Sequence, residues 1–413
     1  MDFDATDLFA LGIKLDKINY DGFWDWFVKF HPVTTLWELQ PTYILVQLVF
    51  LFGGIVTLVH ALLCGGRWPY LWIATILQGL VVELICYVLP NVDNFWHSQT
   101  PVMFFGQHPC FYYQATFAAS KLSLPLKIQP FAVGLLVILL DIPYDIICVK
   151  LVHWTWHDTD PNIYDRHYWV PWNSYFFHTS FAAGFTFWFH YSDNPKWTAS
   201  ENLQQSKSVS TELKSMVRTA LLGAPTGILL FIAIYHPFHD LVAIHSEVTF
   251  FALFAIFDSI VWRHIVTSST QRNQRTGKKG YTKVLIPHLL LHYGLFLGLS
   301  LFASPEEEVS IGLHEPIGPC NETESMHTAF GMVLEKRKYL CIADYDEPYF
   351  DFRCIPGGPP KNKAVWYGIC GTPFENRAEY MLIFSIITGF ASVIFYTLHF
   401  SLKKTNQPHK KKA

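Results

Sequence analysis

Ionisable side chains interrupt stretches of this sequence that are otherwise apolar. Glu83, Asp141, Asp145 and His178 stand in three such stretches. An acid or a histidine inside a bilayer is energetically costly unless it is paired, hydrated or neutralised, so each is a candidate for function. Asp141 and Asp145 are four residues apart with Pro143 between them, which places both carboxylates on one face of a kinked helix. Such groups suit general acid–base catalysis or metal binding.

A second concentration of such residues follows the helix that carries Asp145. Residues 153–161 read HWTWHDTDP and residues 164–173 read YDRHYWVPWN, so three histidines and three aspartates stand among aromatic residues. Tryptophan and tyrosine are common at the membrane surface, but that preference does not explain the histidines and aspartates. The candidate catalytic residues are therefore Glu83, Asp141, Asp145, His157, Asp158 and His178.

Each of these residues, taken singly, also fits a structural role as a polar contact between helices. His288 and His292 form a further pair, four residues apart on one face of a later apolar stretch. The chain contains no HExxH motif and no desaturase-type histidine boxes. The sequence therefore leaves both the metal content and the cofactor unassigned.

The composition places these residues in a membrane protein. Of 413 residues, 51% are hydrophobic and 15% are charged, whereas soluble domains carry about 25% charge. We predict an all-α, polytopic transmembrane helix bundle of nine spans, or of eight if residues 102–121 are re-entrant. The eight clear apolar runs are 43–64, 68–89, 128–152, 172–190, 217–235, 241–267, 283–302 and 379–402.

Basic residues predict the orientation of the bundle. Residues 272–283 and the tail 403–413 are rich in lysine or arginine, so both are expected in the cytosol. Residues 303–378 then lie on the lumenal side. The N-terminus is lumenal with nine spans and cytosolic with eight. No signal peptide is visible in residues 1–42, whose aromatic residues predict an interfacial segment.

The segment 303–378 has the features of a secreted domain. It carries the N-glycosylation sequon Asn321-Glu322-Thr323, and its cysteines are Cys320, Cys341, Cys354 and Cys370. Four cysteines facing an oxidising lumen predict two disulfides, for which three pairings are open. The alternative is that they are free thiols in a disordered loop.

The predicted organisation has five parts: 1–42, the interfacial segment; 43–302, the transmembrane bundle; 303–378, the lumenal or extracellular Cys-rich loop; 379–402, the last transmembrane helix; and 403–413, the cytosolic tail. Lys410 and Lys411 near the chain end resemble the dilysine retrieval signal of endoplasmic reticulum membrane proteins. A lysine-rich end is also an ordinary membrane anchor, so the plasma membrane is the alternative location.

Part of the chain resembles the microbial carotenoid 1,2-hydratase family. The resemblance covers about residues 80–190 and includes Glu83, Phe105-Gly106, Tyr112-Tyr113, Asp145, residues 151–156 (LVHWTW) and residues 168–176 (YWVPWNSYF). It implies a membrane enzyme that adds water to a double bond of an isoprenoid or similar lipid, with Glu83 or Asp145 as the acid. The whole chain also resembles uncharacterised polytopic membrane proteins of animals.

The function expected from the sequence is lumen-facing, hydratase- or hydrolase-like modification of a lipid in the endoplasmic reticulum. The first alternative is a proton- or cation-coupled transporter that uses the same intramembrane residues. The second is a non-catalytic assembly factor or receptor. The expected partners are membrane lipids and a lumenal protein bound through residues 303–378. The net charge of −3 and the lack of a basic stripe argue against nucleic acid binding.

Overall fold

The computed structural model describes residues 32–88, 106–122, 124–191, 203, 207–267, 281–328, 330–361 and 363–400. Residues 1–31 of the predicted interfacial segment lie outside the described residues, and so do the tail 403–413 with Lys410 and Lys411. Most of the basic segment 272–283 lies outside them as well.

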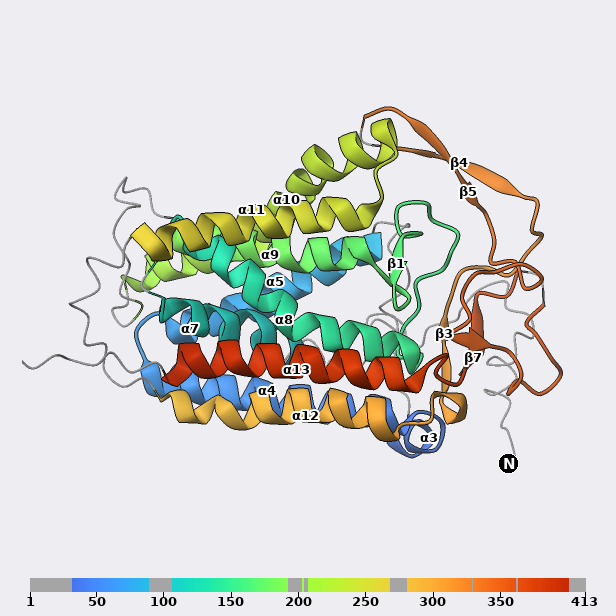
Figure 1. The fold of residues 1–413 in the computed structure, drawn as a ribbon, viewed down its shortest axis with the longest axis horizontal. Coiled ribbons are helices and arrows are strands. Elements are labelled where there is room, and N and C mark those ends of the chain that lie inside the picture. The colour runs from blue at the N-terminus through green and yellow to red at the C-terminus, as the bar shows by residue number, and fades with distance from the viewer. Residues whose placement is uncertain are drawn as a thin grey trace, which may run out of the picture.

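The described chain is dominated by helices that run side by side along one direction (Figure 1). In chain order they are α3 (Val33–Leu39), α4 (Pro41–Cys64), α5 (Trp68–Val88), the π-helical turn η1 (Pro109–Tyr113), α7 (Gln114–Ser120), α8 (Gln129–Lys150), α9 (Trp172–His190), α10 (Val209–Val242), α11 (Ser246–Thr267), η3 (Thr282–Val284), α12 (Ile286–Phe302), η4 (Pro305–Glu307) and α13 (Arg377–Phe400).

Seven helical stretches among the described residues are long and apolar enough to cross a membrane. The prediction of a polytopic helix bundle is confirmed at this level. These stretches are Pro41–Cys64, Trp68–Ile85, Gln129–Lys150, Val209–Val242, Ser246–Thr267, Thr282–Phe302 and Arg377–Phe400.

Two predicted spans differ from these seven. The run 172–190 forms α9, a helix of the predicted length whose polar residues lower its hydropathy. Within 102–121, helix is described over residues 106–120, which rise about 22 Å and are almost entirely buried. That rise is shorter than the hydrocarbon core of about 30 Å. Most residues of both segments are buried, so both segments lie inside the bundle rather than on its lipid-facing surface.

The boundaries predicted for the following helices were wrong. The span predicted at 217–235 is part of α10, which continues through Pro237 to Val242, and α11 begins at Ser246 rather than at 241. The polar residues 236–240 therefore belong to a helix rather than to a loop. His236 Nδ1 and Asp240 Oδ2, one helical turn apart, form a hydrogen bond of 2.7 Å within this extension.

Helix α8 occupies the centre of the bundle. Within its most apolar window 83% of the residues are buried, against 17% for α13, whose exposed face is apolar as lipid contact requires. Helix α9 packs between α8 and α10. A Cβ atom on Gly184 of α9 would lie 2.3 Å from the carbonyl oxygen of Gly223 on α10, so only glycine permits this approach.

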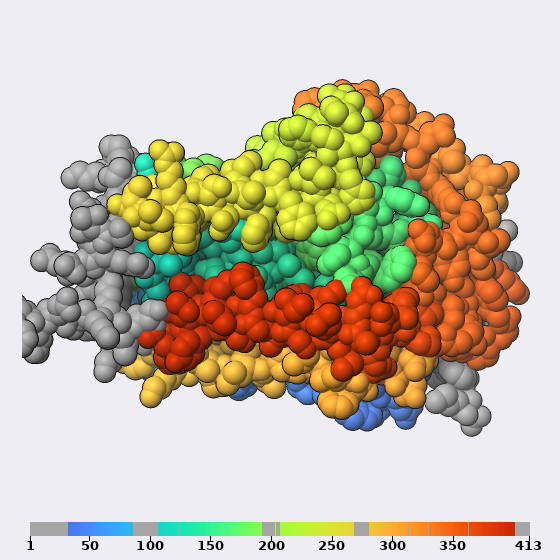
Figure 2. Space-filling view, viewed as in Figure 1, coloured from blue at the N-terminus to red at the C-terminus, as the bar shows by residue number. Residues whose placement is uncertain are grey.

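Residues 303–376, here called the Cys-rich module, cover one end of the bundle (Figure 2). Strands β3 (Val309–Leu313), β7 (Trp366–Gly371) and β6 (Phe350–Asp351) form an antiparallel sheet in that order. Strands β4 (Thr323–His327) and β5 (Val333–Arg337) pair separately, as do β1 (Arg166–His167) and β2 (Val170–Pro171) outside the module. The prediction of an all-α fold is therefore correct for the bundle alone.

Disulfides fix the Cys-rich module. The structure pairs Cys320 with Cys341 and Cys354 with Cys370, with Cα–Cα distances of 4.9 and 5.8 Å. The sequence had left three pairings open. Asn321 is exposed in the turn beside the first disulfide.

Polar contacts join the Cys-rich module to the bundle. Buried Glu308 lies beside Thr42, in the first turn of α4. The Thr42 hydroxyl lies 2.9 Å from His153 Nε2, in the segment that follows α8. Burial raises the pKa of Glu308 to about 7. Thr42 of α4 therefore lies between Glu308 of the module and His153 of the segment after α8.

A buried ion pair joins the helices at the opposite end. Arg67, between α4 and α5, donates from Nε to both oxygens of Glu212 on α10, at 3.0 and 2.9 Å. Its Nη2 also donates to the carbonyl oxygen of Phe189 on α9, at 3.0 Å. Both charged side chains are fully buried. The pair therefore links the turn between α4 and α5 to α9 and α10.

We expect Glu212→Ala to destabilise the protein by about 3–5 kcal/mol, because the Arg67 guanidinium would stay buried without its carboxylate. The double variant Arg67→Met/Glu212→Leu should recover most of that loss. Thermal unfolding in detergent measures both effects, with Glu38→Ala on the exposed face of α3 as the control. Equal melting temperatures for Glu212→Ala and wild type would contradict this role.

Glu308 should make stability depend on pH. Its raised pKa means that the folded state binds a proton more tightly than the unfolded state does, so stability falls as pH rises from about 4.5 to about 7. We expect Glu308→Gln to stabilise the protein by up to about 3 kcal/mol at pH 8 and to have little effect at pH 4. Melting curves at both pH values test this, with exposed Glu306→Gln as the control. Parallel curves for Glu308→Gln and wild type would refute it.

Candidate functional site

Three of the predicted candidates meet inside the bundle. One carboxylate oxygen each of Asp141 and Asp145 on α8 and one imidazole nitrogen of His178 on α9 all lie within 4.8 Å of one another. His178 Nε2 is 3.3 Å from Asp141 Oδ1. Both aspartates are buried, whereas the His178 side chain is 25% exposed. We call these three residues the acid–histidine cluster.

Close packing of α8 against α9 positions the cluster. A Cβ atom on Gly134 of α8 would lie 2.7 Å from the carbonyl oxygen of Thr179, so the α9 backbone passes directly over this glycine. Ser174 is one turn before His178 on the same face of α9, and its hydroxyl donates to Asp145 Oδ2 at 2.8 Å. The two helices thus face each other with an aspartate pair on one side and a serine–histidine pair on the other.

Pro143 links the cluster to α12. Proline has no N–H, so the carbonyl oxygen of Leu139, four residues earlier, loses its intrahelical partner. The Tyr293 hydroxyl donates to that oxygen at 2.9 Å, and His292 Nε2 donates to the next one, Leu140 O, also at 2.9 Å. His292 of the four-apart histidine pair therefore holds the turn of α8 that carries Asp141.

Glu83, the fourth predicted intramembrane candidate, belongs to a neighbouring pair. Glu83 Oε1 on α5 is 3.7 Å from His108 Nε2, just before the turn η1. A Cβ atom on Gly79 would lie 2.3 Å from the His108 ring, so this glycine on α5 makes room for the imidazole. π-Helical turns are frequent at functional sites, and η1 follows His108 directly.

Tyr112 and His108 lie between this pair and the acid–histidine cluster in their electrostatic interactions. Tyr112 lies near enough to interact with the carboxylates of both Asp141 and Glu83. His108 similarly interacts with His178. The structure therefore brings three of the intramembrane candidates together and pairs the fourth, Glu83, with His108 nearby.

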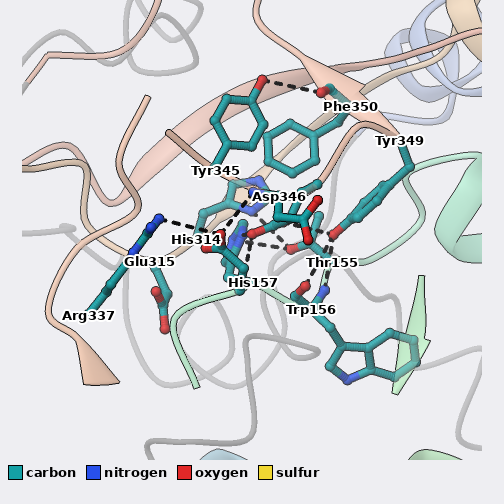
Figure 3. A network of polar contacts seen from close by, with 12 residues as sticks. Thr155, Trp156, His157, His314, Glu315, Arg337, Tyr345, Asp346, Tyr349 and Phe350 are labelled. Atoms are coloured by element: carbon teal, nitrogen blue, oxygen red, sulfur yellow. Dashed lines mark hydrogen bonds and ion pairs between the residues drawn. The ribbon is translucent and has the colours of Figure 1, made fainter. Parts of the chain in front are cut away.

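The other two candidates, His157 and Asp158, have described partners in the Cys-rich module. Figure 3 shows His157 beside residues of that module, among them His314 and Tyr349. His157 Nδ1 is 2.9 Å from Glu347 Oε2, and both side chains are fully buried. The Asp158 N–H donates to Glu347 Oε1 at 2.7 Å, and the Tyr349 hydroxyl donates to Oε2 at 3.0 Å. His157 and the Asp158 N–H therefore meet a buried carboxylate far along the chain. That these two residues act together with the intramembrane candidates stays a prediction.

Burial dominates the electrostatics of this interface. It raises the pKa values of Asp158 and Glu315. Burial, followed by the charge of nearby His157, holds the pKa of His314 well below its ordinary value. The interface is therefore a desolvated contact between the segment after α8 and the module, and its groups anchor the module.

A further histidine–aspartate group joins α10, α11 and the same segment. Asp240 accepts hydrogen bonds from His236 Nδ1 at 2.7 Å and from His239 Nδ1 at 2.9 Å. Asp165 Oδ2 accepts from the backbone N–H and the hydroxyl of Ser246, both at 2.8 Å. His239 Nε2 lies 3.7 Å from Asp165, which connects the two carboxylates.

Sequence reasoning omitted several residues of these networks from its candidates, among them Ser174, His108 and Glu347. Ser174 had a signal, because it stands four residues before His178 on one helix. His108 also had one, because it is an ionisable residue within the apolar run 102–121. Glu347 had none, since its pairing with His157 crosses 190 residues of sequence.

A family model described as Domain of unknown function (DUF7802) matches residues 12–400. Comparison with curated proteins and with solved structures gives no match. The matched range contains the bundle, the acid–histidine cluster and the Cys-rich module. The chain therefore belongs to the DUF7802 family.

Proposed function

We propose that this protein is a membrane enzyme that modifies a lipid or isoprenoid at the acid–histidine cluster. One observation carries the proposal: buried Asp141 and Asp145 on α8 meet His178 on α9 within 4.8 Å. Acids and a histidine in one water-poor site are the groups that proton transfer to and from a substrate requires.

The proposed chemistry is hydration or hydrolysis. In hydration, a carboxyl group donates its proton to one carbon of a double bond, and water adds to the other carbon. His178 or the second carboxylate then takes a proton from the added water, so the product is an alcohol and the site regains its proton. In hydrolysis the same groups activate water and protonate the leaving group. The resemblance noted for residues 80–190 favours Glu83 or Asp145 as the acid.

The partly exposed apolar surface of α8 supports a lipid as the substrate. Its half-exposed apolar residues, Phe131, Leu135, Leu139 and Ile142, recur at helical spacing on one stripe. Figure 2 shows α8 recessed between α11 and α13. We propose that an apolar substrate reaches the cluster laterally, from the membrane, with membrane lipids as its surroundings.

We further propose a location in the endoplasmic reticulum, with a lumenal Cys-rich module and a cytosolic C-terminus. The module's two disulfides and exposed Asn321 support an oxidising lumen. Lys410 and Lys411 would serve in retrieval. The largely exposed strand β4 offers a surface to a lumenal protein partner.

The enzyme proposal predicts a change in cellular lipids. Cells that lack this protein should accumulate a lipid that the wild-type chain removes, and Asp141→Asn or Glu83→Gln should restore at most about 1% of that activity. Mass spectrometry of total lipids after re-expression measures the effect. Asp258→Asn, the same change on an exposed face of α11, is the matched control and should restore the wild-type profile.

An unchanged lipid profile in cells without the protein would refute the enzyme proposal. Proton- or cation-dependent flux in vesicles containing the purified protein, abolished by Asp141→Asn, would instead establish transport. Loss of function on deletion of residues 303–376, together with tolerance of Asp141→Asn, would establish a scaffolding role.

The topology has its own test. If the module is lumenal, the protein should carry a glycan at Asn321, so treatment with endoglycosidase H should increase its electrophoretic mobility. Asn321→Gln should migrate at the deglycosylated position without treatment. A wild-type band that the glycosidase does not shift, from cells in which a known glycoprotein shifts, would contradict lumenal placement.

A further inference from the structure

The two carboxyl groups of the acid–histidine cluster lack a described lysine or arginine to balance their negative charge. Asp141 and Asp145 are one turn apart on a buried face of α8, and no lysine or arginine is among their described contacts. Two buried carboxylates this close repel each other unless a proton or a cation lies between them. Ser174 donates one hydrogen bond to Asp145, which compensates that residue in part.

Asp141 is the less satisfied of the two. Its side chain is fully buried, and neither Oδ1 nor Oδ2 accepts a hydrogen bond from any residue that the structure describes. The nearest partner is His178 Nε2, at 3.3 Å but without hydrogen-bond geometry. A buried acceptor left this way costs free energy that a bound ligand would recover.

The donor spacing matches a metal ion. Two ligand atoms bound to one zinc ion in tetrahedral geometry are about 3.3–3.4 Å apart, since each lies about 2.0–2.1 Å from the metal. The separation of 3.3 Å between His178 Nε2 and Asp141 Oδ1 is already of that size. The remaining donor lies within 4.8 Å of both, which a side-chain rotation can close.

The donor types narrow the choice of ion. An imidazole nitrogen with two carboxylate oxygens suits zinc and other first-row transition metals, whereas magnesium and calcium prefer oxygen ligands alone. Three protein ligands leave a coordination position open, as in catalytic rather than structural zinc sites. The Ser174 hydroxyl, bonded to Asp145, would orient that ligand from outside the coordination sphere.

We propose that Asp141, Asp145 and His178 bind a divalent transition-metal ion, with zinc as the ion that fits best. The site rests on the proposed function and refines it at the same cluster. A bound ion would supply a metal-activated water in place of the proton transfers by Asp145 and His178, which leaves Glu83 as the acid. Glu83 and His108 lie beside it, and they remain available to exchange protons with the substrate.

The test is the metal content of the full-length protein, purified in detergent from zinc-supplemented cells and passed over a desalting column. Wild type should retain about one zinc ion per chain by mass spectrometry, and Asp141→Asn and His178→Ala should each lose most of it. His239→Ala, in the other histidine–aspartate group, and Asp258→Asn are matched controls that should keep it. Zinc below about a tenth of an ion per wild-type chain would overturn the proposal.

A second measurement guards against misfolded variants. Zinc chloride added to metal-stripped protein should raise the melting temperature of wild type but not that of Asp141→Asn. Zinc that persists in both cluster variants, or that His239→Ala removes, would place the ion elsewhere and overturn the proposal. Zinc content does not depend on knowing the substrate, so a bound ion with an unchanged lipid profile would refute the enzyme and leave the metal site standing.

Discussion

The interior of a bilayer supplies no water, so every polar group on α8 needs a partner from a neighbouring element. This constraint organises the bundle. Pro143 frees a carbonyl oxygen, which α12 satisfies through Tyr293, and Asp145 takes the hydroxyl of Ser174 on α9. Among the described residues, neither the Asp141 carboxylate nor the Tyr144 hydroxyl on α8 has a hydrogen bond, and the candidate site converges on Asp141.

At one end of the bundle, the Cys-rich module supplies partners for buried polar groups. The segment after α8 carries histidines and aspartates into a desolvated interface, where buried Glu347 receives both His157 and the Asp158 N–H. Glu308 performs the corresponding role at the start of α4. The module therefore completes the bundle's polar contacts, and the helices that carry the cluster are connected to it through α8.

Sequence periodicity predicted the features that depend on local spacing. Apolar runs located the helices, and the four-residue spacing of Asp141 and Asp145 located the shared face. Features that depend on distant pairing were not predictable. The extension of α10 through Pro237 relies on Asp240 and the segment before α9, and the role of His157 relies on Glu347. The sheet of the Cys-rich module was missed because disulfides and a shared interface, rather than strand patterning, define so small a domain.

Asp141, Asp145 and His178 form one site within the bundle. An electron cryomicroscopy map of the full-length protein in lipid nanodiscs, at a resolution that shows side chains, would reveal this arrangement. We expect the three side chains to converge, with density for an ion between them and with Glu83 beside His108. Side chains of Asp141 or His178 directed toward lipid, or toward separate helix pairs, would contradict it.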